Sequence, residues 1–233
     1  MLVKVDLHIH SALSACCAAE NTVANVVNMS KILNTQIIAL ADHNSAGNVR
    51  AVSVFAEKQG ILVAPAIEVT TAEEIHVLCL FNSVEGAEEF SGEIMRGLPR
   101  YPLNKKFYNP QVLFDCEDNK KGEMDFFLNV ATKFDLYGLT EIMKEYGIAV
   151  PAHVDRDSYS LISVLGFVPE DLFAPTLEIS SRCPTALREE LGKKHNLIWG
   201  SDAHSLEQMC QNECYIDLPE VSVEALINKL KRC

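Results

Sequence analysis

The sequence contains few basic residues for its length, and this shortage bears on the ligands it can bind. Its 233 residues include 20 Lys and Arg against 32 Asp and Glu, giving a formal net charge of −12. Such a charge repels polyanions, and a basic face that follows a nucleic-acid backbone would have to be built from those few cations. The composition therefore predicts no long nucleic acid as ligand. A small anion held by a few local cations or by metal stays compatible with it.

Long hydrophobic runs and CxxC pairs of cysteines are also missing. No apolar run approaches the roughly 18 residues needed to span a bilayer, so we expect no membrane partner. The opening MLVKVDLHIH lacks a basic region followed by a long apolar core, so we expect no secretory signal. The eight cysteines are scattered without a CxxC pair, which favours reduced thiols over disulfides. Together these absences predict a cytoplasmic protein.

Short apolar runs alternate with helical patterns along the chain. Strands are expected at 2–7, 36–41, 61–67, 75–81, 148–154, 174–180 and 196–204. Helices are expected at about 22–33, 48–59, 124–134, 139–146, 159–165, 185–194 and 223–231. This alternation predicts an α/β protein with a parallel sheet, and the length favours a closed or distorted barrel in one domain over residues 1–233. The regularity weakens after 86–97, and a long excursion at about 98–123 could cover a site.

Histidines and carboxylates gather at the ends of the predicted strands. The set consists of Asp6, His8, His10, Asp42, His43, Glu68, His76, His153, Glu178, Asp202 and His204, which leaves His195 as the one histidine outside it. The carboxyl ends of parallel barrel strands share one face, so these residues should meet there. Two imidazoles on one strand face are expensive to bury without a shared partner. Mixed imidazole and carboxylate ligands suit Zn, Mn or Fe, so the pattern predicts a metal site.

Six short motifs then identify a resemblance that runs in order along nearly the whole chain. They are DLHIH at Asp6–His10, ADHN at Ala41–Asn44, IEV around Glu68, HVLCLF from His76, PAHVDR at Pro151–Arg156 and SDAH at Ser201–His204. The set resembles the polymerase and histidinol phosphatase (PHP) family of metal-dependent phosphoesterases. The resemblance implies a distorted (β/α)7 barrel with two or three divalent metal ions, Zn, Mn or Fe.

The resemblance also implies which residues hold each ion. The first metal would take His8, His10, Glu68 and Asp202; the second Glu68, His76 and His153; and the third His43, His204 and a histidine six residues after His10. In this chain that last position is Cys16. A thiolate there would favour Zn or Fe over Mn or Mg. The alternatives are that Cys16 is only a small loop residue in a two-metal protein, or that Cys17 supplies the thiolate.

The same reading assigns roles beyond the metal ligands. Asp42 is expected either to orient an imidazole or to cap a helix. Arg156 and Arg182, each just past a strand, are expected to grip phosphate or the leaving group, with surface ion pairs as the alternative. His204 or a metal-bound water would protonate the leaving group.

The sequence thus predicts a metal-dependent phosphoesterase that hydrolyses a small phosphorylated metabolite, for example a nucleotide, with metal-activated water. A metal-stabilised module for interaction or sensing, without catalysis, is the alternative from another functional class. Metal-dependent hydrolysis of a carbon–nitrogen bond or carboxyl ester is a third possibility, because fold does not determine substrate.

Overall fold

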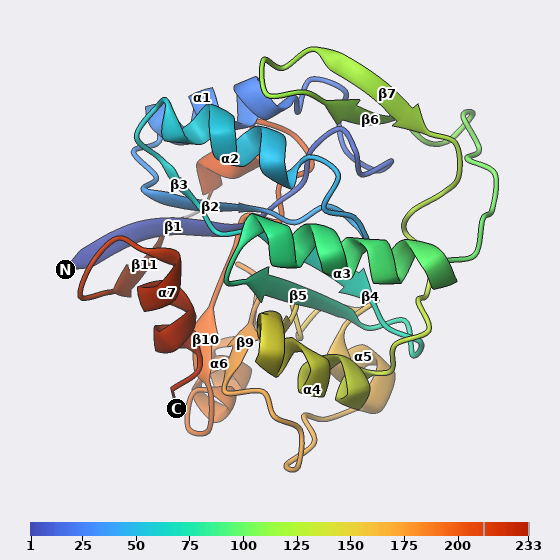
Figure 1. Cartoon of the computed structure of the whole chain (residues 1–233). Helices are drawn as coiled ribbons and strands as arrows, with labels where there is room; N and C mark the ends of the chain where they lie inside the picture. Colours follow the sequence, from blue (N-terminus) through green and yellow to red (C-terminus); the bar gives the residue numbers. More distant parts are fainter. Residues whose placement is uncertain (212, 233) are drawn as a thin grey trace.

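The computed structural model describes residues 1–211 and 213–232 as a mixed α/β protein (Figure 1). The strands are β1 (Leu2–Ile9), β2 (Ile37–Leu40), β3 (Leu62–Val63), β4 (Ala66–Thr70), β5 (His76–Phe81), β6 (Gln111–Phe114), β7 (Lys120–Met124), β8 (Gly147–Pro151), β9 (Thr176–Glu178), β10 (Asn196–Ile198) and β11 (Cys214–Asp217). The helices are α1 (Val23–Ile32), α2 (Val49–Glu57), α3 (Val84–Gly97), α4 (Leu136–Tyr146), α5 (Leu161–Leu165), α6 (Thr185–Leu191), the 3-10 helix η1 (Gln208–Gln211) and α7 (Val223–Leu230). Within the described residues, every helix is too short or too polar to span a bilayer.

The first sheet, in the order β11-β1-β2-β3, carries the opening motif. β1 and β2 run parallel because α1 forms the crossover between them. Along β1, Val3, Val5 and Leu7 enter a hydrophobic cluster, and the alternation of a strand turns Asp6 and His8 to the other face. That second face is buried too, so the polar side chains of β1 must find partners inside the protein.

The second sheet corrects the expectation of parallel strands. Its strands β4, β5 and β8 are antiparallel, and Thr70 of β4 faces His76 of β5. Only residues 71–75 separate these two strands, whereas a parallel connection needs a crossover of about a dozen residues or more. The turn therefore places the start of β5, and His76 with it, beside the end of β4.

The strand ladders remain separate from one another. β9 and β10 form a parallel pair and β6 and β7 a hairpin, so the described strands make four sheets instead of one closed ladder. Isolated bridges join Ile9 to Ala203 and His43 to Glu68, which links the sheets near the ends of β1, β2 and β4. The α/β class is confirmed, while the hydrogen-bonded ladders stop short of the continuous barrel that the resemblance implies.

The helix expected at 124–134 is wrong. β7 ends at Met124 and the residues after it are irregular. The side chain of Asn44 holds this stretch, because its Nδ2 donates to the carbonyl oxygens of Leu128 at 2.6 Å and Val130 at 2.8 Å. Carbonyl groups that accept from a distant side chain are not accepting the i→i−4 bonds of a helix.

A long helix, α3, occupies a stretch for which we expected no helix from the sequence. Ser83 caps it by accepting a hydrogen bond from the backbone of Gly86. Its buried face includes Ala87, Phe90 and Ile94, which have helical spacing. This apolar spacing was an available signal for the helix, although Gly86 and Gly92 lower its intrinsic helix propensity.

The excursion at 98–123 forms most of the β6–β7 hairpin, which Figure 1 shows in green and yellow-green at the top of the view. Asn109 attaches the excursion to the loop that follows β1: its backbone N–H donates to the Ala15 carbonyl at 3.0 Å, and its Nδ2 to the Cys17 carbonyl at 2.8 Å. The excursion therefore packs on the segment that carries the two neighbouring cysteines.

Candidate metal centre

The strand ends bring together side chains from separate stretches of the chain. The cluster contains His8 and His10 of the first motif, His43 after β2, Glu68 in β4, His76 at the start of β5, His153 after β8, and Asp202 and His204 after β10. All of them are buried except His204, which is partly exposed. Three overlapping groups have one donor atom per residue within 4.8 Å of one another: His8, His10 and Glu68; His43, Glu68 and His76; and His10, His43 and His204.

Glu68 occupies the centre of this cluster. Its Oε1 lies 2.9 Å from Nδ1 of His76 and 3.1 Å from Nε2 of His153. Its Oε2 lies 2.9 Å from Nδ1 of His43 and 3.4 Å from Nε2 of His10. One carboxylate thus faces imidazoles on both of its oxygens.

Several buried atoms of the cluster have no hydrogen-bond partner among the described residues. They are Nε2 of His8, Nδ1 of His43, Oε2 of Glu68, Nε2 of His76 and Nδ1 of His153. A buried polar atom without a partner costs roughly 1–3 kcal/mol. His43 Nδ1 and Glu68 Oε2 are close yet lack the geometry of a hydrogen bond. Imidazole and carboxylate donors suit Zn, Mn and Fe, so the residues present fit divalent metal ions.

Asp202 joins the cluster to an arginine at its rim. Its Oδ1 lies 3.1 Å from Nε2 of His10 and 3.5 Å from Nε2 of His8, and its Oδ2 lies 2.5 Å from Nη1 of Arg156. Asp202 and His153 have φ values of 46° and 31°, a left-handed conformation that costs about 1–3 kcal/mol per residue. The surrounding packing holds this strain where the side chains converge.

Gly200 permits the close approach of the chain after β10 to β1. A Cβ atom at this position would lie 2.5 Å from Cβ of His8 and 2.8 Å from Oε1 of Glu178. Any other residue would push apart the segments that carry Asp202 and the first histidine pair.

Glu178 supports the cluster from outside, and sequence reasoning assigned it no role. Its Oε2 accepts a hydrogen bond from the backbone N–H of His153 at 3.0 Å and lies 2.9 Å from Nδ1 of His8. The carboxylate thereby fixes the His8 ring so that Nε2 points to Glu68 and Asp202. Its place at the end of β9, level with the other strand ends, was the available signal.

Replacing Glu178 by Gln is expected to lower metal affinity about 10- to 100-fold, the usual effect of removing a group that orients a ligand. The loss arises because an amide holds the His8 imidazole less strongly than a carboxylate does. Competition with a chromogenic chelator measures the affinity. Glu190→Gln, an equal charge change on the exposed face of α6, is the control; equal affinities in both variants would contradict the orienting role.

Asp42 reaches the cluster through a serine. Its Oδ1 accepts from the backbone N–H of Ser11 at 2.8 Å and from Oγ of Ser14 at 2.7 Å, and Ser14 Oγ also lies 3.0 Å from Nδ1 of His10. Asp42 therefore orients the His10 ring indirectly, by fixing the hydroxyl group that contacts it. The structure records no helix cap by this residue, since α2 begins after Asn48.

The first histidine pair lies in a strongly negative environment. Burial alone would lower the pKa of His8, but Glu178 and Glu68 outweigh it and raise that pKa well above its usual value. Against burial, the hydrogen bond with Asp202 and the nearby carboxylate of Glu68 raise the pKa of His10 to about 9. Cations that bind these imidazoles near neutral pH therefore displace protons.

On the other side of the cluster, the pKa values of two histidines are lowered. Burial lowers the pKa of His43 to about 3, and burial together with repulsion from His10 lowers the pKa of His204 to about 4. Both imidazoles are neutral near pH 7, so each has a lone pair for a cation.

Of the two neighbouring cysteines, Cys16 faces the cluster. Its Sγ lies 3.3 Å from Nε2 of His43. Although the residue is exposed as a whole, removal of water from around the thiol, together with the charge of Glu68, raises its pKa to about 12. The thiol of Cys17 instead donates to the backbone carbonyls of His10 and His204. The structure therefore places Cys16, and not Cys17, beside the imidazoles.

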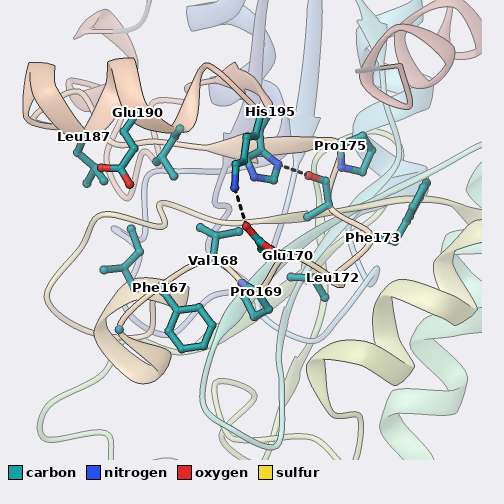
Figure 2. A pocket seen from close by; sticks show the side chains of 15 residues that line it. Phe167, Val168, Pro169, Glu170, Leu172, Phe173, Pro175, Leu187, Glu190 and His195 are labelled. Atoms are coloured by element: carbon teal, nitrogen blue, oxygen red, sulfur yellow. Dashed lines mark hydrogen bonds and ion pairs between the residues drawn. The ribbon is translucent and has the colours of Figure 1, made fainter.

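Arg182 and His195 both lie apart from the cluster. Arg182 is exposed in the loop past β9. His195 lies outside the cluster, as the sequence predicts, with Nδ1 2.7 Å from the Ala174 carbonyl oxygen. It lines a largely apolar cavity of about 690 Å³ beside Phe167 and Phe173 (Figure 2). This cavity lies where β9 and β10 begin, whereas the cluster lies where they end.

Comparisons with known proteins find the fold but no relative by sequence. No protein-family model matches the chain, and no curated protein matches it. Among solved structures, the lesion-specific endonuclease PfuEndoQ from Pyrococcus furiosus has a TM-score of 0.68 at 18% identity over 99% of this chain. Endonuclease Q in complex with a 27-mer duplex substrate with an abasic lesion at the active site gives 0.64 at 17% over 99%. This chain covers only 56% and 57% of those chains, a little over half their length.

Two further structures match over most of both chains. A protein assigned as a metal-dependent phosphoesterase, from Bifidobacterium adolescentis, has a TM-score of 0.61 at 15% identity and covers 97% of this chain and 95% of its own. An amidohydrolase from Chromobacterium violaceum has a TM-score of 0.62 at 16% identity, with 94% and 93% covered. The resemblance to PHP phosphoesterases is thus confirmed at the level of the fold, and the proteins named here are hydrolases, in agreement with the predicted enzyme class.

The exclusion of long nucleic acid is wrong. A protein that shares this fold over 99% of the present chain is described in complex with a 27-mer duplex. A net charge sums over the whole surface, whereas a ligand experiences the local field, and bound divalent ions are large positive charges in a site. The net charge of −12 therefore does not exclude a nucleic-acid ligand.

Proposed function

We propose that this chain is a cytoplasmic metal-dependent phosphoesterase. Its substrate would be the phosphate ester of a small metabolite or of a nucleotide, and the nucleotide would be either free or part of a nucleic-acid strand. The buried atoms without a hydrogen-bond partner at Glu68 Oε2, His8 Nε2 and His43 Nδ1 carry this proposal, since bound cations would satisfy them. When bound, such ions supply a deprotonated water near pH 7 and compensate the charge of the phosphoryl oxygens.

The assignment of ligands is the one that the PHP resemblance implies, and each proposed set shares at least two residues with one of the overlapping groups of donors. His8, His10, Glu68 and Asp202 would hold one ion, Glu68, His76 and His153 a second, and Cys16, His43 and His204 a third. In this arrangement Asp42 and Glu178 keep the rings of the first pair oriented. His204 suits a ligand better than a proton donor, because its Nδ1 already faces the Asp202 carbonyl oxygen at 2.9 Å.

The arginines would bind the substrate. Arg156 is half-exposed above Asp202 and can offer its remaining N–H groups to a phosphoryl oxygen at the rim of the cluster. Arg182, exposed past β9, would contact the more distant part of the substrate. The excursion at 98–123 would cover the site, consistent with its hydrogen bonds to the loop after β1.

Product analysis after incubation with a panel of substrates is the experiment that tests this function. Phosphomonoesters, phosphodiesters, oligonucleotides with and without an abasic site, an amide and a carboxyl ester are supplied to protein purified without oxygen and loaded with Mn, Fe or Zn. Hydrolysis of a phosphoester that requires metal and disappears in His153→Ala is expected. Cleavage of the amide alone would favour the amidohydrolase class. Failure to hydrolyse any substrate with any of the metals would favour a module without catalysis.

Replacing Cys16 by Ser is expected to remove one metal equivalent and leave the others bound. A hydroxyl group is a poor substitute for a thiolate toward Zn or Fe. Metal analysis gives the stoichiometry, and the thiolate charge-transfer absorption of Co²⁺-loaded protein reports the sulfur ligand directly. Cys116→Ser, in the excursion, is the control. Unchanged stoichiometry and absorption in the Cys16 variant would leave Cys16 without a role as a ligand.

A further inference from the structure

A small cavity lies beside the metal centre, at the turn between β4 and β5. It measures about 280 Å³, and its lining includes Thr70, Glu74, Tyr101, Asn129 and Tyr159. Pockets for drug-sized ligands measure about 300–1,000 Å³, so this one suits a single ring system better than a whole nucleotide.

Tyr159 connects the cavity to the metal centre. Its ring stacks on the imidazole of His76 with centroids 4.8 Å apart and an angle of 23° between the planes. Its carbonyl oxygen accepts a hydrogen bond from the His76 backbone N–H at 2.9 Å. The residue has a φ of 52°, a strained conformation for a bulky side chain, yet 45% of it is exposed. The chain thus holds an aromatic ring in a fixed position with much of its surface uncovered.

Tyr101 supplies a second uncovered ring to the same cavity. It is 60% exposed, while its backbone is fixed because its carbonyl oxygen accepts a hydrogen bond from Phe127 N–H at 2.8 Å. Exposing two tyrosine rings at one cavity forgoes the burial that usually stabilises aromatic side chains. Such rings provide stacking surfaces for a flat ligand.

The polar groups of the cavity add hydrogen bonding. Asn129 Oδ1 accepts from Thr70 Oγ1 at 3.2 Å, and its Nδ2 donates to no other described residue, which leaves it free for an acceptor on a ligand. The exposed carboxylate of Glu74 can accept from a ring N–H or amino group. The wall is tied to the metal centre, since Asn44, next to His43, accepts from Thr70 N–H and donates to the Val130 carbonyl.

We infer that this cavity, between Tyr101 and Tyr159, binds a planar heteroaromatic ring of the substrate, such as a nucleobase, while the phosphoester lies at the metal centre. The placement of the phosphoester at the metal centre rests on the proposed phosphoesterase function. The ring would stack against the tyrosines and pair its polar edge with Asn129 and Glu74. A substrate without such a ring would lose these contacts and bind more weakly.

Binding of compounds that lack a phosphoester tests the cavity without relying on hydrolysis. Adenosine, uridine and ribose are titrated into metal-loaded protein and followed by ligand-observed NMR. Both nucleosides are expected to bind in preference to ribose, and Tyr101→Ala is expected to weaken them about fivefold or more, as loss of a stacking surface does. Tyr101→Phe should retain the affinity, and Tyr215→Ala, an exposed tyrosine on β11, should leave it unchanged.

Equal binding of ribose and nucleosides, no binding of either nucleoside, or a Tyr101→Ala variant as tight as the unaltered protein would each overturn the inference. Where a nucleotide is hydrolysed, Tyr101→Ala should raise its KM with little change in kcat and leave ribose 5-phosphate hydrolysis unaffected. Base-dependent binding in a protein that hydrolyses no phosphoester would contradict the proposed function and leave the cavity assignment intact.

Discussion

Glu68→Gln is expected to abolish metal-dependent hydrolysis, with a loss of at least about a hundredfold in kcat, as for removal of one preorganised charged group in an active site. The carboxylate lies within 3.4 Å of five imidazole nitrogens, on His8, His10, His43, His76 and His153. Glutamine keeps the volume and can still bond to an imidazole, but it removes the charge that two ions would share. Initial rates on the substrate found in the panel give the measurement.

Folding must be separated from chemistry in this variant. The pKa of Glu68 is held well below its usual range because, against burial, His76 and His8 stabilise the charged form. The unaltered protein therefore gains stability from this carboxylate above the ordinary glutamate pKa and loses it as pH falls through the depressed value. Circular dichroism checks that Glu68→Gln is folded; a folded, metal-replete variant with near-normal turnover would sink the bridging role.

Asp202→Asn is expected to have the second largest effect, again at least about a hundredfold in kcat. Asp202 contacts both His8 and His10 and receives Arg156, so its loss affects one metal and one substrate contact together. Asparagine is the better substitution here, because it tolerates the left-handed φ of 46° that alanine would adopt only with strain.

Asp157→Asn is the control, because it makes the same charge change at an exposed position next to Arg156. Parallel metal analysis divides the two contributions of Asp202. A variant that keeps its full metal content but has a raised KM would assign Asp202 chiefly to holding Arg156. Unchanged kinetics with unchanged metal content would exclude the residue from the site.

Much of the cluster could be predicted because its residues are close in sequence to strand ends. His8, in β1, and His10, directly after β1, are separated by one residue, and Asp202 and His204 repeat that spacing after β10. Any parallel arrangement of those strands brings them to one edge. His76 opens its strand, and it joins the cluster only because the turn at 71–75 makes β5 antiparallel.

The remaining features depend on contacts between distant residues. Glu178 is one carboxylate among many in the sequence, and its role follows only from contacts with His8 and His153. The stretch after Met124 has helix-forming residues, but Asn44 captures its carbonyl groups across the fold. Total charge likewise says nothing about the field within one site, which is why the exclusion of nucleic acid was wrong.

The most direct test of the account is the metal content of the purified protein after loading with Mn, Fe or Zn and removal of excess ion. Two or three ions per chain in the unaltered protein, and a clear loss of bound metal in folded Glu68→Gln, are the predicted result. A folded, unaltered protein that retains less than one ion per chain with every metal would contradict the metal centre, and with it the proposed phosphoesterase.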